Sequence, residues 1–112
     1  MKVYFIGAGP GDPELMTLKG ARILKACPVV LYAGSLIPRE LLQEVEGSAE
    51  QILDTATMDL EQISAVIQQA HAEDKDVARL QCGDPSLYGA IGEQIRRLER
   101  AGIDYEVVPG VS

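Results

Sequence analysis

Near its start the 112-residue chain reads Val3-Tyr4-Phe5-Ile6-Gly7-Ala8-Gly9-Pro10-Gly11-Asp12-Pro13. Four apolar residues are followed at once by glycines and prolines, a pattern that indicates a buried strand ending in a tight loop. Further apolar runs occur at 28–32, 51–53, 76–81 and 104–108, and we expect these to be strands as well.

The segments between these runs have helical spacing and helix-capping residues. Thr17 is placed to cap a helix that runs to about residue 26, and Pro38 suits the first turn of a helix to about 45. Asp59 with Gln62 resembles a capping box, and a last helix over about 88–101 should stop at Gly102. Strands that alternate with helices predict an α/β fold with a parallel sheet covered on both faces.

Ligands of such sheets bind outside the carboxyl ends of the strands. The glycine-bearing segments 7–13, 83–89 and 109–112 each follow a predicted strand, so we expect a site at that edge. Segment 7–13 departs from the dinucleotide motif, because its third glycine comes one place early and no carboxylate lies between Glu14 and Glu40. It is either a tight structural turn or a loop that brings backbone close to a ligand.

The second loop leaves two interpretations open for Asp84, which could cap the next helix or hold an amine or hydroxyl of a ligand. Cys27 and Cys82 have no CxxC spacing, so we interpret them as free thiols in a reducing cytoplasm. His71, the single histidine, is expected on the surface of a helix. Nucleophilic hydrolysis and metal binding therefore have little support.

Charge and composition exclude other classes of protein. Ten Lys and Arg against 17 Asp and Glu give a net charge of −7, which disfavours a nucleic-acid binder. No apolar run is long enough to span a membrane, and the start does not resemble a signal peptide. The final residues read as a strand entering a loop, so we interpret the chain as the first part of a longer protein.

Three motifs together resemble the tetrapyrrole methylases, the S-adenosylmethionine-dependent methyltransferases of cobalamin and sirohaem synthesis. They are the opening stretch 3–20, Arg79-Leu80-Gln81-Cys82-Gly83-Asp84-Pro85-Ser86-Leu87-Tyr88-Gly89, and Tyr105-Glu106-Val107-Val108-Pro109-Gly110-Val111-Ser112. Stretches 31–38 and 83–94 are similar to the branch that methylates C11 of precorrin-4 or cobalt-precorrin-4. Uroporphyrinogen-type members generally have an acidic residue where this chain has Ala33.

The resemblance implies that residues 1–112 are an N-terminal, three-layer αβα domain with a five-stranded parallel sheet. A second domain, absent from this chain, would hold the cofactor against it, so the chain alone is expected to be inactive. The cofactor would be S-adenosyl-L-methionine, with S-adenosyl-L-homocysteine as product, and the substrate a small tetrapyrrole. The resemblance also implies a homodimer, whereas the charge and residue patterns given above are the reason to expect no metal, nucleic acid or membrane partner. By the same resemblance the residues that contact the cofactor are Pro10, Cys82, Gly83, Asp84, Leu87 and Ser112.

Other interpretations remain at this point. The chain could belong to a precorrin-2, precorrin-3 or uroporphyrinogen-III methyltransferase, or to a nucleotide-binding module without chemistry. A NAD-dependent oxidoreductase is weakened by the missing ribose carboxylate. Cys82 departs from the Ser, Thr or Gly that relatives are expected to have there. The negative net charge is unfavourable for a polycarboxylate substrate, so Arg39 or the second domain would have to compensate.

Overall fold

The computed structural model describes residues 1–7, 17–32, 37, 39–81 and 90–108. Strands and helices alternate along these residues, as the sequence predicts. The elements are β1 (Lys2–Gly7), α1 (Leu18–Ala26), β2 (Val29–Tyr32), α2 (Arg39–Val45), β3 (Gln51–Asp54), the 3₁₀ helix η3 (Thr55–Thr57), α3 (Leu60–Ala72), β4 (Val77–Gln81), α4 (Ala90–Ala101) and β5 (Asp104–Val108).

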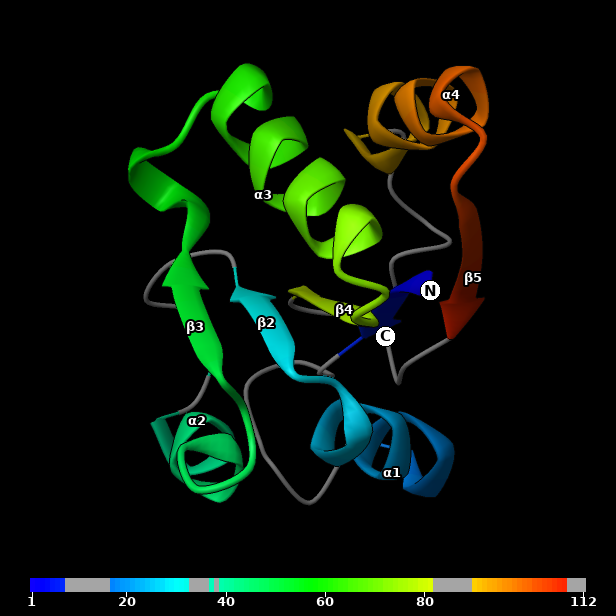
Figure 1. The fold of residues 1–112 in the computed structure, drawn as a ribbon. Coiled ribbons are helices and arrows are strands. Elements are labelled where there is room, and N and C mark those ends of the chain that lie inside the picture. The colour runs from blue at the N-terminus through cyan, green and yellow to red at the C-terminus, as the bar shows by residue number, and fades with distance from the viewer. Residues whose placement is uncertain (8–16, 33–36, 38, 82–89, 109–112) are drawn as a thin grey trace.

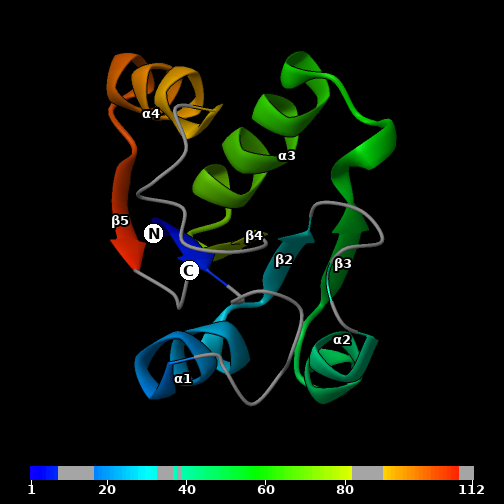
Figure 2. The same ribbon diagram turned by 180° about the vertical axis from the view of Figure 1, so that it is seen from behind.

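The five strands form one parallel sheet in the order β3-β2-β4-β1-β5. Helices α1 and α2 cover one face and α3 and α4 the other, which gives three layers (Figures 1 and 2). The predicted fold class, a three-layer αβα domain with a five-stranded parallel sheet, is confirmed. None of the described helices is long and apolar enough to cross a lipid bilayer.

Two helices begin at the caps that the sequence indicates. The Oγ1 of Thr17 accepts a hydrogen bond from the backbone N–H of Gly20 at 3.1 Å. The carboxylate of Asp59 accepts from the N–H of Gln62 at 2.8 Å, while the Gln62 side chain accepts from the N–H of Asp59 at 2.9 Å. This reciprocal pair is a capping box, and it satisfies two donors that α3 leaves unpaired at its start.

The core consists of two clusters, one on each face of the sheet. Side chains of β4 alternate between them: Val77 packs on the α3/α4 side, whereas Ala78 and Leu80 pack on the α1/α2 side. On the α3/α4 side Phe5 meets Tyr105 edge-on, with ring centroids 6.4 Å apart. Strands buried on both faces read as continuous apolar runs, which is the pattern seen in the sequence.

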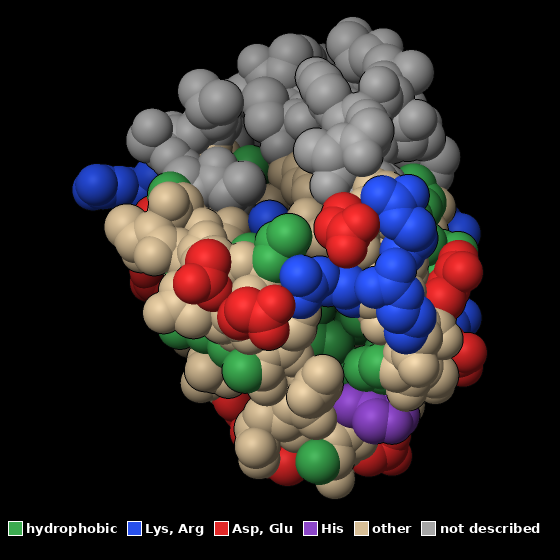
Figure 3. Space-filling view, turned by 90° about the horizontal axis from the view of Figure 1, so that it is seen from above, with side chains coloured by type: hydrophobic (Ala, Val, Ile, Leu, Met, Phe, Trp, Pro, Cys, Tyr) green, Lys and Arg blue, Asp and Glu red, His purple; other side chains and the backbone are tan. Residues whose placement is uncertain are grey.

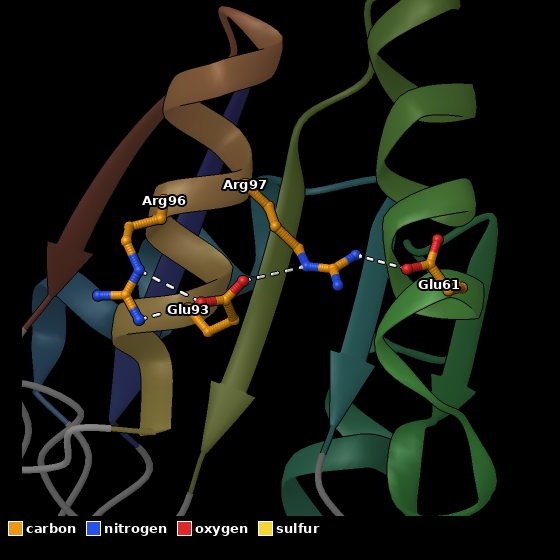
Figure 4. A network of polar contacts seen from close by, with 4 residues as sticks. All are labelled: Glu61, Glu93, Arg96 and Arg97. Atoms are coloured by element: carbon orange, nitrogen blue, oxygen red, sulfur yellow. Dashed lines mark hydrogen bonds and ion pairs between the residues drawn. The ribbon is translucent and has the colours of Figure 1, made fainter.

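Charged side chains join α3 and α4 at the surface (Figure 4). The Arg97 Nη1 donates to Glu61 Oε1 of α3 at 3.0 Å, and Arg96 donates to Glu93 within α4 at 3.0 Å. Figure 3 shows this face, where basic and acidic side chains lie next to each other. The sequence predicts a solvated face here. Exposed pairs of this kind contribute little to stability, about 0–1 kcal/mol each.

Helix α4 stops directly before Gly102, as predicted, and this glycine has a positive φ of 71°. The N–H of Gly102 donates to Glu99 O, and the N–H of Ile103 donates to Leu98 O. We expect Gly102→Ala to lower the free energy of unfolding by about 1–2 kcal/mol, because an L side chain is strained at this φ. Urea denaturation of the chain measures this change.

Gly47→Ala is the matched control for that prediction. A Cβ at either glycine would meet nothing within 4 Å, but only Gly102 of the two has a positive φ. We therefore expect Gly47→Ala to leave stability unchanged or to raise it by about 0.4–1 kcal/mol, since alanine restricts the unfolded chain. Equal losses at both positions would contradict the role assigned to the Gly102 backbone.

Candidate functional site

The carboxyl ends of all five strands lie at one edge, because the sheet is entirely parallel. There β1 lies between β4 and β5, with Gly7 opposite Gln81 and Ile6 opposite Val108. The three glycine-bearing segments therefore leave from three neighbouring strands. The prediction that these loops start at one edge of the sheet is confirmed.

At the adjacent strands β4 and β1 the connections leave toward opposite faces of the sheet. Strand β1 continues into α1 on one face of the sheet, whereas β4 continues into α4 on the opposite face (Figures 1 and 2). Adjacent strands whose connections go to opposite faces leave a crevice between them, and ligands of open α/β sheets bind in such crevices. The first and second motifs both begin at this pair of strands.

The residues that the resemblance assigns to cofactor contact all lie outside the described residues. The described strands nevertheless fix where their segments start: Cys82 directly follows Gln81, the last residue of β4, and the segment with Pro10 follows Gly7. Gly83, Asp84 and Leu87 belong to the segment between β4 and α4, and Ser112 follows β5. Their contacts with the cofactor stay predictions.

Beneath this edge lies a polar cluster, built around two buried side chains, that the sequence analysis missed. Its members are Arg79 on β4, Thr55 on η3 and Gln94 on α4. The Arg79 Nη1 donates to Thr55 Oγ1 at 3.0 Å, and Arg79 Nε donates to Gln94 Oε1 at 3.2 Å. Thr55 Oγ1 in turn donates to the carbonyl of Tyr32 at 3.0 Å. A single arginine within the apolar run 76–81 was the available signal.

Burial lowers the pKa of the Arg79 guanidinium from its ordinary value, because the charged form loses hydration. Arginine stays charged across the physiological range even so. The cluster thus places a positive charge inside the α3/α4 layer, close to the carboxyl ends of β2 and β4. It has the donors and acceptors to fix these elements, but no group suited to proton transfer at neutral pH.

Other titratable groups within the described residues do not form a reactive centre. The Cys27 thiol is buried, and His71 is exposed on α3 as predicted. The described part of the chain has no group of three His, Cys, Asp or Glu side chains that could hold a metal ion. Arg39 is exposed at the start of α2, which follows the segment leaving the carboxyl end of β2.

A hollow of about 440 Å³ lies on the outer face between α3 and α4. Its lining includes Ser64 and Gln68 of α3 and Arg97 and Arg100 of α4, with Ile103 at one end. These are helix and helix-end residues, not residues at the carboxyl ends of the strands. We therefore do not assign the predicted cofactor site to this hollow.

The sequence and fold of the chain can now be compared with those of known proteins. Residues 2–112 match the model of the tetrapyrrole (corrin/porphyrin) methylases, which is nearly the whole chain. The chain belongs to the tetrapyrrole methylases. The resemblance seen in its three motifs is thereby confirmed.

Individual proteins that are similar to the chain support the same family. A precorrin-4 C(11)-methyltransferase of Pseudomonas aeruginosa is 61% identical over 112 residues, which are 100% of this chain and 44% of that protein. The structure of a cobalt precorrin-4 methyltransferase superposes with a TM-score of 0.93 at 47% identity, covering 99% of this chain and 46% of the other.

A second solved structure carries a ligand. It is the uroporphyrin-III C-methyl transferase of Thermus thermophilus in complex with S-adenosylhomocysteine, with a TM-score of 0.81 and 41% identity. It matches 100% of this chain, which covers 46% of that protein. This tetrapyrrole methylase chain thus spans less than half the length of the relatives that it matches.

Proposed function

We propose that the protein containing this chain is an S-adenosylmethionine-dependent C-methyltransferase of cobalamin biosynthesis, which methylates precorrin-4 or cobalt-precorrin-4 at C11. The observation that carries the proposal is the 61% identity to a precorrin-4 C(11)-methyltransferase over the whole chain. The structural superposition on a cobalt precorrin-4 methyltransferase, with a TM-score of 0.93, supports the same branch over the uroporphyrin-type structures at 0.81 to 0.84.

Within this proposal residues 1–112 are the N-terminal domain that binds the cofactor, and a second domain completes the site. The chain by itself is inactive. The cofactor lies over the carboxyl ends of β4, β1 and β5, in contact with Pro10, the 82–84 segment, Leu87 and Ser112. The opposite directions of the connections after β4 and β1 fit this assignment, because both motif loops begin at these two strands. A cytoplasmic homodimer belongs to the same proposal, and a free Cys27 thiol agrees with that compartment.

Bound S-adenosylmethionine supplies an electrophilic methyl group on a sulfonium. The task of this chain is then to hold the cofactor in one orientation and to exclude water from it. Positioning of two reactants can lower a barrier by about 7–11 kcal/mol. A ring carbon of a reduced tetrapyrrole is already nucleophilic, so a strong general base is not required. The described residues agree with this, since the Arg79 cluster offers positioning without proton transfer.

The first experiment is calorimetric titration of S-adenosylhomocysteine into the protein made from the complete reading frame, with NAD as the parallel titrant. The expected result is saturable binding of S-adenosylhomocysteine and none of NAD. A methyl-transfer assay with precorrin-4, read by mass spectrometry, should then give a product heavier by one methyl group. Binding of NAD alone, or of neither ligand by a folded protein, would overturn the cofactor assignment.

Asp84→Asn separates the two interpretations of that residue. We expect it to weaken S-adenosylhomocysteine binding about tenfold or more, because a hydrogen bond to a charged group contributes about 1.5–3 kcal/mol. Asp59→Asn is the control, since Asp59 caps α3 and asparagine caps helices equally well. If the wild-type protein binds and Asp84→Asn binds as tightly, Asp84 is a helix cap and makes no contact with the cofactor.

A further inference from the structure

Thr55 and Arg79 are the buried polar side chains of the described residues, each 6% exposed, and they bond to each other. Burying a guanidinium costs free energy unless it is paired and hydrogen-bonded. Arg79 donates hydrogen bonds to neutral oxygens, and the ion pairs within the described ranges do not include it. An apolar residue would fill the same position of a buried strand at lower cost. This arrangement therefore calls for a role beyond packing.

The contacts of Arg79 reach the ends of three other elements. Thr55 stands directly after β3, and its hydroxyl also bonds the carbonyl of Tyr32, the last residue of β2. Gln94 belongs to the first half of α4. One guanidinium on β4 thus joins, directly or through Thr55, the carboxyl ends of β2 and β3 to the beginning of α4.

These elements flank the loops of the proposed cofactor site. The segment 82–89 starts after Gln81 of β4 and ends before Ala90 of α4, so Arg79 and Gln94 lie close to its two ends in the chain. The segment 33–38 starts after Tyr32, whose carbonyl Thr55 holds. Apolar contacts have no preferred direction. A planar guanidinium has donors in fixed directions, so its hydrogen bonds favour one relative position of the elements that it joins.

We propose that Arg79, Thr55 and Gln94 form a positioning cluster that fixes the ends of β2, β4 and α4, and thereby the cofactor-binding loop between β4 and α4. The inference rests on the proposed function, and it assigns none of the three residues a contact with the cofactor. Binding residues must be held within about 0.5 Å of their productive geometry by such supporting groups. Loosening the cluster should therefore weaken cofactor binding in a protein that is still folded.

Thr55→Val tests this in the complete protein. Valine has nearly the shape of threonine but removes the acceptor for Arg79 and the donor to Tyr32. Thr55→Ser keeps the hydroxyl and serves as the rescue. Thr57→Val, at an exposed position of the same 3₁₀ helix, is the matched control. Calorimetry with S-adenosylhomocysteine, well below the unfolding temperature, and urea denaturation are run on all four proteins.

We expect Thr55→Val to weaken S-adenosylhomocysteine binding about tenfold, because it leaves the buried Arg79 Nη1 without its acceptor and the Tyr32 carbonyl without the hydroxyl donor. The other two variants should stay within about twofold of wild type. If Thr55→Val is folded and binds like wild type, with only its urea midpoint lowered, the cluster is structural and the inference is overturned. If the wild-type protein itself does not bind, the proposed function fails instead.

Gln94→Leu keeps the test decisive if Thr55→Val does not fold. It removes only the bond between Arg79 and α4, and Gln68→Leu on the exposed face of α3 is its control. Weaker binding by Gln94→Leu than by Gln68→Leu supports the positioning role. Equal binding by the two folded variants contradicts it.

Discussion

Leu31→Ala is expected to lower the free energy of unfolding by about 2–5 kcal/mol. Leu31 is fully buried in β2, between β3 and β4, and packs in the α3/α4 cluster with Phe5 and Ile63. The substitution removes apolar contacts and leaves a cavity that a sheet held on both sides cannot close. Urea denaturation of the 112-residue chain, followed by far-ultraviolet circular dichroism, measures the loss.

Leu18→Ala provides the control with identical chemistry. Leu18 is the first residue of α1 and is 91% exposed, so its truncation should change stability by less than about 0.5 kcal/mol. Since both variants exchange leucine for alanine, most effects on the unfolded chain cancel in the comparison. Similar losses for the two would show that Leu31 does not lie in a packed core.

The order of elements was predictable from the sequence because each depends on local patterns. Apolar runs bounded by glycine and proline indicated the strands, and Thr17, Asp59 and Gly102 marked helix ends that the structure confirms. The spatial order β3-β2-β4-β1-β5 depends on pairings between distant segments, to which a local pattern gives no access. Where the predicted and observed limits of a strand differ, they differ by one residue.

Asp76 and Thr55 show how tertiary contacts decide such limits. Asp76 was expected inside a strand, but its carboxylate accepts the backbone N–H of Lys2 at 2.8 Å, and β4 begins at Val77. The 3₁₀ helix after β3 was missed because only some of its contacts are local in the sequence, while another comes from a distant strand. Asp54 caps it locally by accepting from the N–H of Ala56 at 2.9 Å, whereas Thr55 is held by Tyr32 from another strand.

The same distinction holds for the candidate site: its local motifs were predictable from the sequence, but contacts between distant segments were not. The glycine-bearing loops were visible as motifs, and a parallel sheet requires their strands to end at one edge. That three of these strands are neighbours follows only from the register of β1 with β4 and β5. The Arg79 cluster joins residues from β4, η3 and α4, so only its arginine was visible in the sequence.

In the folded protein Cys27 is expected to react with iodoacetamide at pH 8 about a thousandfold more slowly than in the unfolded chain. Burial raises the pKa of this thiol from 9.0 to about 12, with a smaller contribution from Asp76. Only the thiolate is nucleophilic, and a shift of this size reduces its fraction at pH 8 by about three powers of ten. Mass spectrometry of tryptic peptides measures the rate, because Cys27 and Cys82 fall in separate peptides.

The same shift sets the sign of a pH dependence. The folded state keeps the proton on Cys27 where the unfolded chain releases it, so this contribution to stability is complete below pH 9.0 and is lost as the pH rises toward about 12. Alkylation of native Cys27 within about tenfold of the unfolded rate would contradict its burial. Cys27 packs with Ile6, Leu24 and Val30 in the α1/α2 cluster, so its sulfur serves as an apolar group.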